Sequence, residues 1–298
     1  MTFRQFLLVV EIRTKVISIS TYLLATLYAA AAGFEITWIT ALLLALAVLC
    51  VDMGTTAFNT FYDYARGVDT PLLTVEPDKV LVHEGVAPAH AFLVSVALYA
   101  VAAGTGIAVA VISSWWVLVA GFAGMLVGFL YNGGPRPISR TPLGELFAGG
   151  FLGSVLFLVV YGVHAGEIAA HAFVASVPST LIIAAVLTVN NTCDIEGDRD
   201  AGRRTLSIVL GRAAARVLIA TLCVGAYVMI VPATSRLPSP PFARLGIPGI
   251  GMLASAVMLV GMLRRGFHHR TKHPNMVAMI RIVMVYTLAY AGTLVPAI

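Results

Sequence analysis

The chain has few charged residues and few cysteines for its length. Of its 298 residues only 11% are charged, whereas soluble domains carry about 25%. Because a water-facing surface needs many more charges, this composition excludes an ordinary soluble domain. The three cysteines form no CxxC pair, so neither a disulfide framework nor a zinc site is expected. The mean hydropathy of +0.92 instead places most of the chain in lipid.

Long apolar runs dominate what is present. A helix needs about 20 apolar residues to cross the hydrocarbon core, and nine runs approach that length. The alternating segments typical of barrel strands are missing, and no cleavable signal peptide is evident. We therefore expect an all-α integral membrane protein, one domain of residues 1–298 with nine transmembrane helices around a central cavity. The expected spans are roughly 16–33, 38–60, 90–113, 115–131, 145–164, 171–190, 213–232, 246–263 and 275–297.

The basic residues indicate an orientation. With a cytoplasmic N-terminus and nine alternating spans, most of the 19 Lys and Arg residues fall in cytoplasmic loops. The opposite side holds only Arg236 and Arg244. This bias favours a cytoplasmic N-terminus and an outer C-terminus. Because the basic residues are scattered over short loops, no nucleic-acid partner is expected.

The few acids gather at the ends of two apolar runs. Asn59 and Asp63 end the second expected span, and Asn190 and Asp194 end the sixth with the same Asn-x-x-x-Asp spacing. Residues four apart share one face of a helix. Because four spans separate the two ends, both are expected on the same membrane face, where they meet over one central cavity.

Each cluster continues with more carboxylates. Asp69 follows Gly67, where the helix should stop, and is expected to fold back toward Asp63. Asp198 lies four residues after Asp194, on the same face. Several carboxylates in one place repel one another, and oxygen ligands without a cysteine or histidine pattern favour Mg²⁺. Since Mg²⁺ usually binds through a few carboxylates and substrate phosphates, the clusters predict a metal-held diphosphate.

The basic loops and the apolar bundle fit the same ligand. A cavity between apolar spans suits a hydrocarbon tail, so a lipid diphosphate such as a polyprenyl diphosphate is expected. Asp52 lies seven residues before Asn59, on the same helix face. There it either accepts hydrogen bonds from neighbouring helices or lines the substrate cavity. The cations that are candidates for binding phosphate oxygens are Lys79, Arg136, Arg140, Arg203 and Arg204.

These motifs resemble those of the UbiA superfamily of intramembrane prenyltransferases over nearly the whole chain. The closer similarity is to the MenA branch, the 1,4-dihydroxy-2-naphthoate polyprenyltransferases. In "NTFYDYARGVD" Asn59 and Asp63 match that branch, while Thr60 replaces its first aspartate. "NNTCDIEGDRDAGRRTL" resembles the second motif, with Cys193 where an arginine is common. "YNGGPRPISRTPLGELFAG" resembles a third segment, and "VEIRTKVIS" the opening of a subgroup in Gram-positive bacteria.

The resemblance implies Mg²⁺-dependent transfer of a polyprenyl group to an aromatic acceptor, most simply 1,4-dihydroxy-2-naphthoate in menaquinone synthesis. It places the site on the cytoplasmic side of a bacterial plasma membrane. It implies catalytic roles for Asp63, Asp194 and Lys79. The expected metal ligands are Asn59, Asp63, Asp69, Asn190, Asp194 and Asp198. The expected substrate contacts are Lys15, Asp52, Asn59, Arg66, Lys79, Tyr131, Arg136, Asn191 and Arg203.

Two other functions are weighed against this one. A UbiA-type terpene cyclase uses the same metals, but a double bond of the prenyl chain itself attacks, so no acceptor is needed. A transporter would use the acids to carry ions, although no clear pair of broken helices accompanies them. The tail length, the acceptor and the oligomeric state stay open at this point. His268, His269 and His273 are expected only to lie at the membrane interface.

Overall fold

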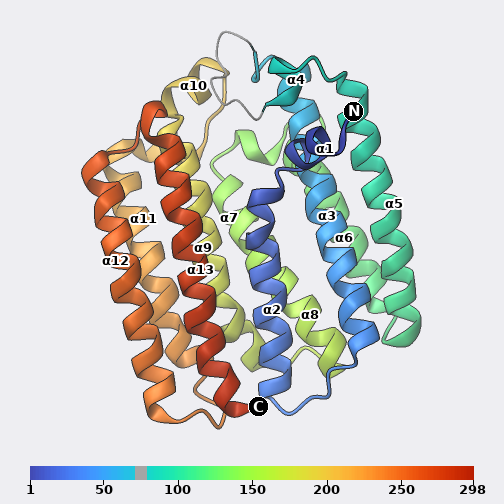
Figure 1. The fold of residues 1–298 in the computed structure, drawn as a ribbon, viewed down its shortest axis with the longest axis vertical. Helices are drawn as coiled ribbons and strands as arrows, with labels where there is room; N and C mark the ends of the chain where they lie inside the picture. Colours follow the sequence, from blue (N-terminus) through green and yellow to red (C-terminus); the bar gives the residue numbers. More distant parts are fainter. Residues whose placement is uncertain (71–78) are drawn as a thin grey trace.

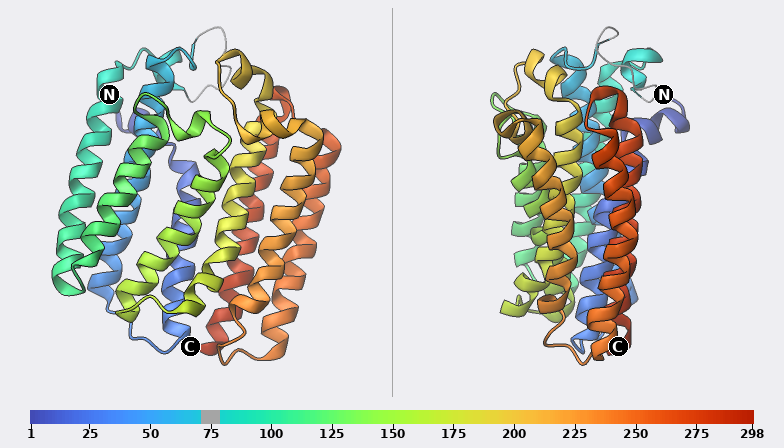
Figure 2. Two further views of the ribbon diagram at one scale, coloured as in Figure 1. Left: turned by 180° about the vertical axis from the view of Figure 1, so that it is seen from behind. Right: turned by 90° about the vertical axis from the view of Figure 1, so that its left-hand side faces the viewer.

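The protein is a bundle of helices that run nearly parallel along its longest axis (Figures 1 and 2). The structure is a computed structural model that describes residues 1–70 and 79–298. Within these two ranges no β-strand forms. The predicted all-α membrane fold is thereby confirmed.

Eight helical segments of the described chain are long and apolar enough to cross a membrane. The ninth expected span corresponds to α6 (Trp116–Asn132), which is apolar but only 17 residues long. The count of nine crossings is therefore not confirmed. Five of the eight are α3 (Trp38–Ala65), α5 (Pro88–Ile112), α7 (Gly144–Gly149) continued through a π-helical segment into α8 (Leu156–Ala165), α9 (Ala170–Cys193) and α11 (Leu206–Ala233). The other three reach spanning length together with short 3-10 or π segments at their ends: α2 (Val16–Ala31) within Ile12–Ala31, α12 (Ile247–Arg265) within Phe242–Arg265 and α13 (Lys272–Leu294) within His269–Ala297.

Three short helices lie at one end of the bundle, which is also the end that holds the N-terminus (Figure 1). They are α1 (Phe3–Val9), α4 (Val80–His83) and α10 (Ile195–Asp200). The C-terminus lies at the opposite end. An odd number of passes along the bundle places the two termini in this way. The assignment of the N-terminal end to the cytoplasm remains a prediction.

Helix α9 is the most buried of the spans and packs extensively against α11. Close packing on its other side depends on Gly153, because a Cβ there would collide with the backbone of Thr180. The Ser154 hydroxyl hydrogen-bonds to the hydroxyls of Ser176 and Thr180 across this contact. Helix α3 packs in the same extensive way against α5. The bundle thus positions the ends of α3 and α9, where the two acidic motifs lie.

Two cavities of about 310 and 250 Å³ lie at the end of the bundle away from these motifs. The larger is lined by residues that include Glu35 and His164, the smaller by residues that include Tyr28 and Arg236. Neither is the central cavity that the sequence predicts beside the acidic motifs. That cavity remains a prediction.

Candidate active site

The first motif closes the long helix α3. Asn59 and Asp63 lie in its last two turns, and Gly67 follows with a positive φ of 69°. This left-handed conformation ends the helix, and only glycine adopts it without a steric cost. The backbone N–H groups of Val68 and Asp69 then donate to the Asp63 carbonyl, at 2.9 and 3.1 Å. Asp69 therefore returns beside Asp63, as the sequence predicts.

The second motif follows a similar backbone course. Helix α9 ends at Cys193, and the N–H of Asp198 in α10 donates to the Asp194 carbonyl at 2.8 Å. Gly202 has a φ of 69°, and the N–H of Arg203 returns to the Asp198 carbonyl at 2.8 Å. Asp198 is buried, and this burial raises its pKa to about 6 although Arg203 opposes the shift.

Arg203 joins the two motifs. Its guanidinium lies 2.7 Å from Oδ1 of Asp63 in the first motif and 3.3 Å from Oδ1 of Asp198 in the second. The planar fork of arginine suits two carboxylates at once. The two acidic clusters therefore meet at one end of the bundle, as their spacing predicts, and Arg203 lies between them.

Besides Arg203, Lys79 also contacts a carboxylate of the first motif. It immediately precedes α4, and its Nζ lies 3.3 Å from Oδ2 of Asp69 and 3.4 Å from Oε1 of Glu11. Burial by itself would lower the pKa of Lys79, but the carboxylates of Glu11, Asp69 and Asp63 outweigh it and raise that pKa well above its ordinary value. The three carboxylates therefore favour the charged form of Lys79. Glu11 was not expected from the sequence, because it lies 68 residues from Lys79.

The second motif has its own cations, which come from the loop and helix near the C-terminus. Lys272 Nζ lies 2.6 Å from Oδ2 of Asp194, and His269 Nδ1 lies 3.1 Å from its Oδ1. The contact between His269 and Asp194 was not expected from the sequence, because no local pattern links "HHRTK" to Asp194. The expected position of His269 at the membrane interface remains a prediction.

The donor set fits a hard divalent cation. Oδ2 of Asp198 is buried without a hydrogen-bond partner in the described chain, and the amide groups of Asn59 and Asn190 make no side-chain hydrogen bond there. These oxygens are the ligands that Mg²⁺ prefers. Within residues 1–70 and 79–298, no three Asp, Glu, His or Cys side chains already stand close enough to hold a metal. The carboxylates are held by the chain's own cations instead.

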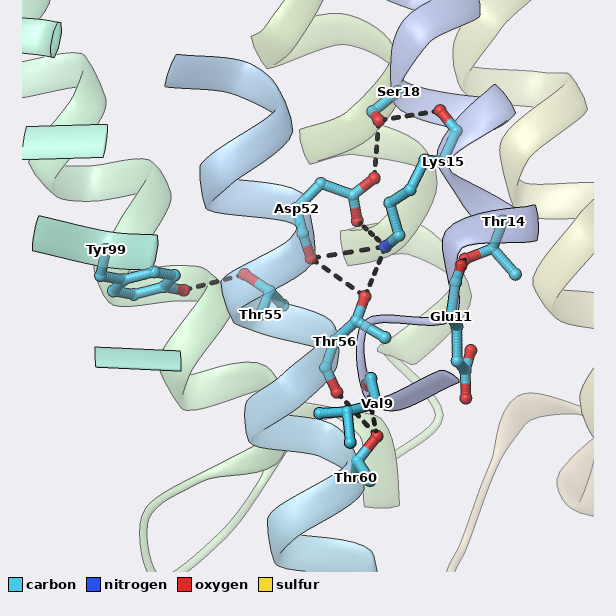
Figure 3. Close-up of polar contacts among 10 residues, drawn as sticks. All are labelled: Val9, Glu11, Thr14, Lys15, Ser18, Asp52, Thr55, Thr56, Thr60 and Tyr99. Carbon is cyan, nitrogen blue, oxygen red and sulfur yellow. Dashed lines mark hydrogen bonds and ion pairs between the residues drawn. The ribbon is translucent and has the colours of Figure 1, made fainter. Parts of the chain in front are cut away.

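Lys15 and Asp52 form a separate network inside the bundle (Figure 3). Lys15 is 2% exposed, and its Nζ donates to Oδ1 of Asp52 at 2.8 Å and to the Thr56 hydroxyl at 2.6 Å. Ser18 donates to the other oxygen of Asp52 at 2.6 Å. Of the two roles considered for Asp52, the structure shows the acceptance of hydrogen bonds from a neighbouring helix. Contact of Lys15 or Asp52 with substrate remains a prediction.

Thr60, which stands where the MenA-like pattern has an aspartate, faces this same side of α3. Its side chain is 5% exposed, and its hydroxyl donates to the Val9 carbonyl at 3.0 Å. The position therefore anchors the N-terminal segment.

Arg66 and Asn191, both expected to contact substrate, bind other parts of the chain. The Arg66 guanidinium donates to the carbonyls of Asn132 and Gly134, each at 2.6 Å, and lies over the Tyr62 ring. It thereby holds the loop after α6. Buried Asn191 donates to Oε1 of Glu145 at 2.9 Å and links α9 to α7. These contacts position the loops around the site.

The remaining expected contacts lie around the third sequence segment. Tyr131 is partly buried near the end of α6, and Arg136 is exposed without a partner in the described residues. The Arg140 side chain donates to the Ala201 carbonyl, and its own carbonyl accepts from the backbone of Arg204 at 2.9 Å. Arg140 thus fastens this segment to the second motif.

Most of the chain is similar to known proteins. The model of the UbiA prenyltransferase family matches residues 18–287. This chain belongs to that family. It is 36% identical over 183 residues to 1,4-dihydroxy-2-naphthoate octaprenyltransferase of Bacillus subtilis (strain 168), an alignment that covers 61% of this chain and 58% of that protein. The chain spans less than two thirds of the length of the curated relatives first matched.

Solved structures of the family share the fold. A UbiA homologue from Aeropyrum pernix K1 superposes with a TM-score of 0.65 at 19% identity, covering 90% of this chain and 96% of that one. A UbiA homologue from Archaeoglobus fulgidus, bound to DMAPP and Mg²⁺, gives 0.63 at 14% identity, covering 96% and 99%. At these identities the likeness establishes the architecture alone.

Proposed function

We propose that this protein transfers a polyprenyl group from an isoprenoid diphosphate to an aromatic acceptor, with 1,4-dihydroxy-2-naphthoate as the acceptor and Mg²⁺ as the cofactor. The observation that carries the proposal is the meeting of the two acidic motifs through Arg203 at one end of an apolar bundle. The relative from Bacillus subtilis is named for that acceptor, and the homologue from Archaeoglobus fulgidus binds DMAPP and Mg²⁺.

We assign the metal ligands to the carboxylate and amide oxygens of the two motifs. Asn59, Asp63 and Asp69 from the first motif, with Asn190, Asp194 and Asp198 from the second, supply only oxygen ligands. When bound, Mg²⁺ spreads the negative charge that develops on the departing diphosphate. Lys79, Arg203 and Lys272 already lie against these carboxylates. They are placed to bind phosphate oxygens once metal neutralises the acids.

The reaction breaks the bond between the prenyl carbon and the diphosphate oxygen, and forms a carbon–carbon bond to the electron-rich ring. The ring then loses a proton and regains aromaticity. With a naphthoate acceptor carbon dioxide also leaves, and a proton takes its place on the ring carbon that carried the carboxylate. Asp63, Asp194 and Lys79 orient the diphosphate, and the apolar bundle keeps water from the electron-poor prenyl carbon. Positioning and electrostatics thus supply most of the rate.

The test is a product assay on purified protein in detergent. Geranylgeranyl and longer all-trans diphosphates are supplied with Mg²⁺, with and without 1,4-dihydroxy-2-naphthoate, and products are identified by mass. A prenylated naphthoquinol that requires the acceptor supports the proposal. A cyclic hydrocarbon formed without acceptor identifies a cyclase, and absence of diphosphate release in every mixture rejects prenyl transfer.

Variants separate the site from the fold. Asp63→Ala should keep the thermal unfolding temperature within a few degrees and lose turnover by at least about 100-fold, because a metal ligand is gone. Glu84→Gln is the matched control, since Glu84 lies near the same end of the bundle and its side chain binds Arg4 and Gln5 among the described residues. Full turnover by Asp63→Ala would remove the first motif from the mechanism.

A further inference from the structure

The N-terminal segment lies along one polar stripe of α3 (Figure 3). Asp52, Thr56 and Thr60 are spaced by four residues and share a helix face. All three bind the segment: Lys15 contacts Asp52 and Thr56, and the Val9 carbonyl accepts from Thr60. The chain between Val9 and Lys15 is therefore fastened at both ends to the helix that carries the first motif.

Glu11 lies between these two anchors in an unusual backbone conformation. Its φ is 46°, and it is the one non-glycine residue with positive φ in the described chain. Side chains with a Cβ are disfavoured there, and glutamate is not among the residues that tolerate it well. Its carboxylate takes no part in the Lys15 network (Figure 3) and lies instead 3.4 Å from Lys79 Nζ. Strained residues that persist often serve a functional contact.

The Lys79 contacts are long compared with the other lysine–carboxylate pairs of the protein. Lys272 lies 2.6 Å from Asp194 and Lys15 lies 2.8 Å from Asp52, which are ordinary charge-assisted distances. Lys79 lies 3.3 Å from Asp69 and 3.4 Å from Glu11. The ammonium is thus shared between two carboxylates and closes fully on neither.

We infer that Glu11 is a positioning residue that holds Lys79 back from Asp69, so that Lys79 stays available to a diphosphate and Asp69 to its metal. This inference rests on the proposed function, which makes Lys79 a diphosphate contact. Without the Glu11 carboxylate, the pull that draws Lys79 away from Asp69 is lost, and a ligand would first have to break a closer Lys79–Asp69 ion pair.

The apolar surroundings keep the two partners together. Val9 at the end of α1 and Val10 after it pack with Val80 and Leu81 of α4 around Ala57 of α3. Both Val9 and Val80 are fully buried. Glu11 and Lys79 are next to this cluster in sequence, so neither backbone moves away without exposing it. The charge of Glu11 also raises the pKa of Lys79, as do the charges of Asp69 and Asp63.

The experiment measures binding of inorganic pyrophosphate with Mg²⁺ to the detergent-solubilised full chain, by the ligand-dependent rise in unfolding temperature. Glu11→Gln keeps the side-chain length and removes the charge. We expect about fivefold weaker pyrophosphate binding, the effect of one partly exposed ion pair. Simple electrostatics predicts the opposite sign, because removal of a negative charge favours an anion. Unchanged or tighter binding by Glu11→Gln therefore overturns the inference.

A second pair of variants isolates the charge from the backbone. Asp and Asn both tolerate the left-handed conformation better than Glu, so Glu11→Asp and Glu11→Asn relieve the same strain. We expect Glu11→Asp to retain part of the pyrophosphate affinity and Glu11→Asn to lose it. Equal affinities for the two variants would assign Glu11 a backbone role alone and overturn the inference. Glu84→Gln, which loosens α1 without touching Lys79, should bind as the unaltered protein does.

A double-mutant cycle shows whether Glu11 acts through Lys79. In a Lys79→Gln background, Glu11→Gln should cause no further loss of pyrophosphate affinity, and in the single variant KM for the prenyl diphosphate should rise while kcat changes little. An undiminished loss in that background overturns the inference alone. If Lys79→Gln itself binds pyrophosphate normally, Lys79 is not a diphosphate contact, and the assigned role of Lys79 fails together with the inference.

Discussion

The two helix ends that build the site share a local pattern but differ in what supports them. Both carry Asn-x-x-x-Asp, both are followed by a glycine near φ 69°, and in both an N–H beyond that glycine returns to an aspartate carbonyl. The end of α3 is supported by the segment near the N-terminus, through Lys15, Thr60 and Glu11. The end of α9 is supported by residues near the C-terminus, His269 and Lys272.

This difference shows how a repeated motif becomes an asymmetric site. A helix end with two acids has no means of holding its own carboxylates apart, so each half depends on cations from elsewhere in the chain. Lys272 closes tightly on Asp194, whereas Lys79 is shared between two acids. Among the described residues, Arg203 is the one side chain that forms ion pairs with carboxylates of both halves. The following predictions test these separate supports, from the largest expected effect to the smallest.

The largest loss of folding stability is expected when the Lys15–Asp52 ion pair, which supports the first half of the site, is broken. Lys15→Met leaves the Asp52 carboxylate buried without its cation, and such a loss typically costs about 3–5 kcal/mol of folding stability. The unfolding temperature in detergent measures it. Lys15→Met/Asp52→Leu, which leaves no buried charge, should lose less than Lys15→Met alone. A double variant at least as unstable as the single one would contradict a buried ion pair at this position.

The second-largest effect is expected at Arg203, which joins the two halves of the site. Arg203→Gln leaves Asp63 and Asp198 facing each other without a cation, so we expect turnover to fall by about 100-fold, equivalent to about 2.7 kcal/mol. Arg203→Lys should recover only part, because one ammonium does not match the fork that spans two carboxylates. Steady-state kinetics on both variants provides the measurement. Equal turnover for lysine and arginine would show that charge alone suffices.

The two lysines should separate stability from binding. Lys272→Gln removes a tight contact to Asp194 and should cost about 1 kcal/mol of stability, the upper end for partly exposed pairs. Lys79→Gln removes two long contacts and should affect stability less but pyrophosphate affinity more. Unfolding temperatures and pyrophosphate titrations on the same two samples decide this. The reverse ranking would place the more important phosphate contact in the second half.

The outermost contact should have the smallest effect. Hydrogen bonds from Arg4 and Gln5 lower the pKa of the partly exposed Glu84 carboxyl below its ordinary value of 4.5. Its contribution is therefore present above pH 4.5 and is lost as the pH falls through the lower pKa of the folded state. Glu84→Gln should lower the unfolding temperature slightly at pH 7, and this difference should shrink as the pH falls below 4.5. A difference that grows toward pH 3 would contradict this linkage.

Much of the site could be predicted because its residues follow local rules. The spacing of Asn59 and Asp63 on one helix face, and the stop at Gly67, depend only on helix geometry and on glycine. The meeting of the two motifs followed from counting spans. The predicted span 115–131 corresponds to α6, which has the expected apolar composition but is shorter than the eight candidate spans.

The supporting contacts could not be predicted. Glu11 and Lys79 lie 68 residues apart, and His269 and Asp194 lie 75 apart. No periodicity links residues at such separations. Thr60 and Asn191 lie within the motifs, yet their side chains face Val9 and Glu145. Which face of a helix a neighbour covers is set by packing, so a motif pattern assigns such residues to the site whether or not they point into it.

The sequence by itself therefore determined the membrane-spanning helices, the shared end of the two acidic motifs and the oxygen-rich donor set. These follow from hydropathy, helix periodicity and the chemistry of carboxylates, which act locally along the chain. Only the tertiary structure decided which cation holds each acid, and that Arg203 joins the halves while Glu11 and Lys272 support one each. Ion pairs form between groups that packing brings within about 4 Å, and packing is a property of the whole bundle.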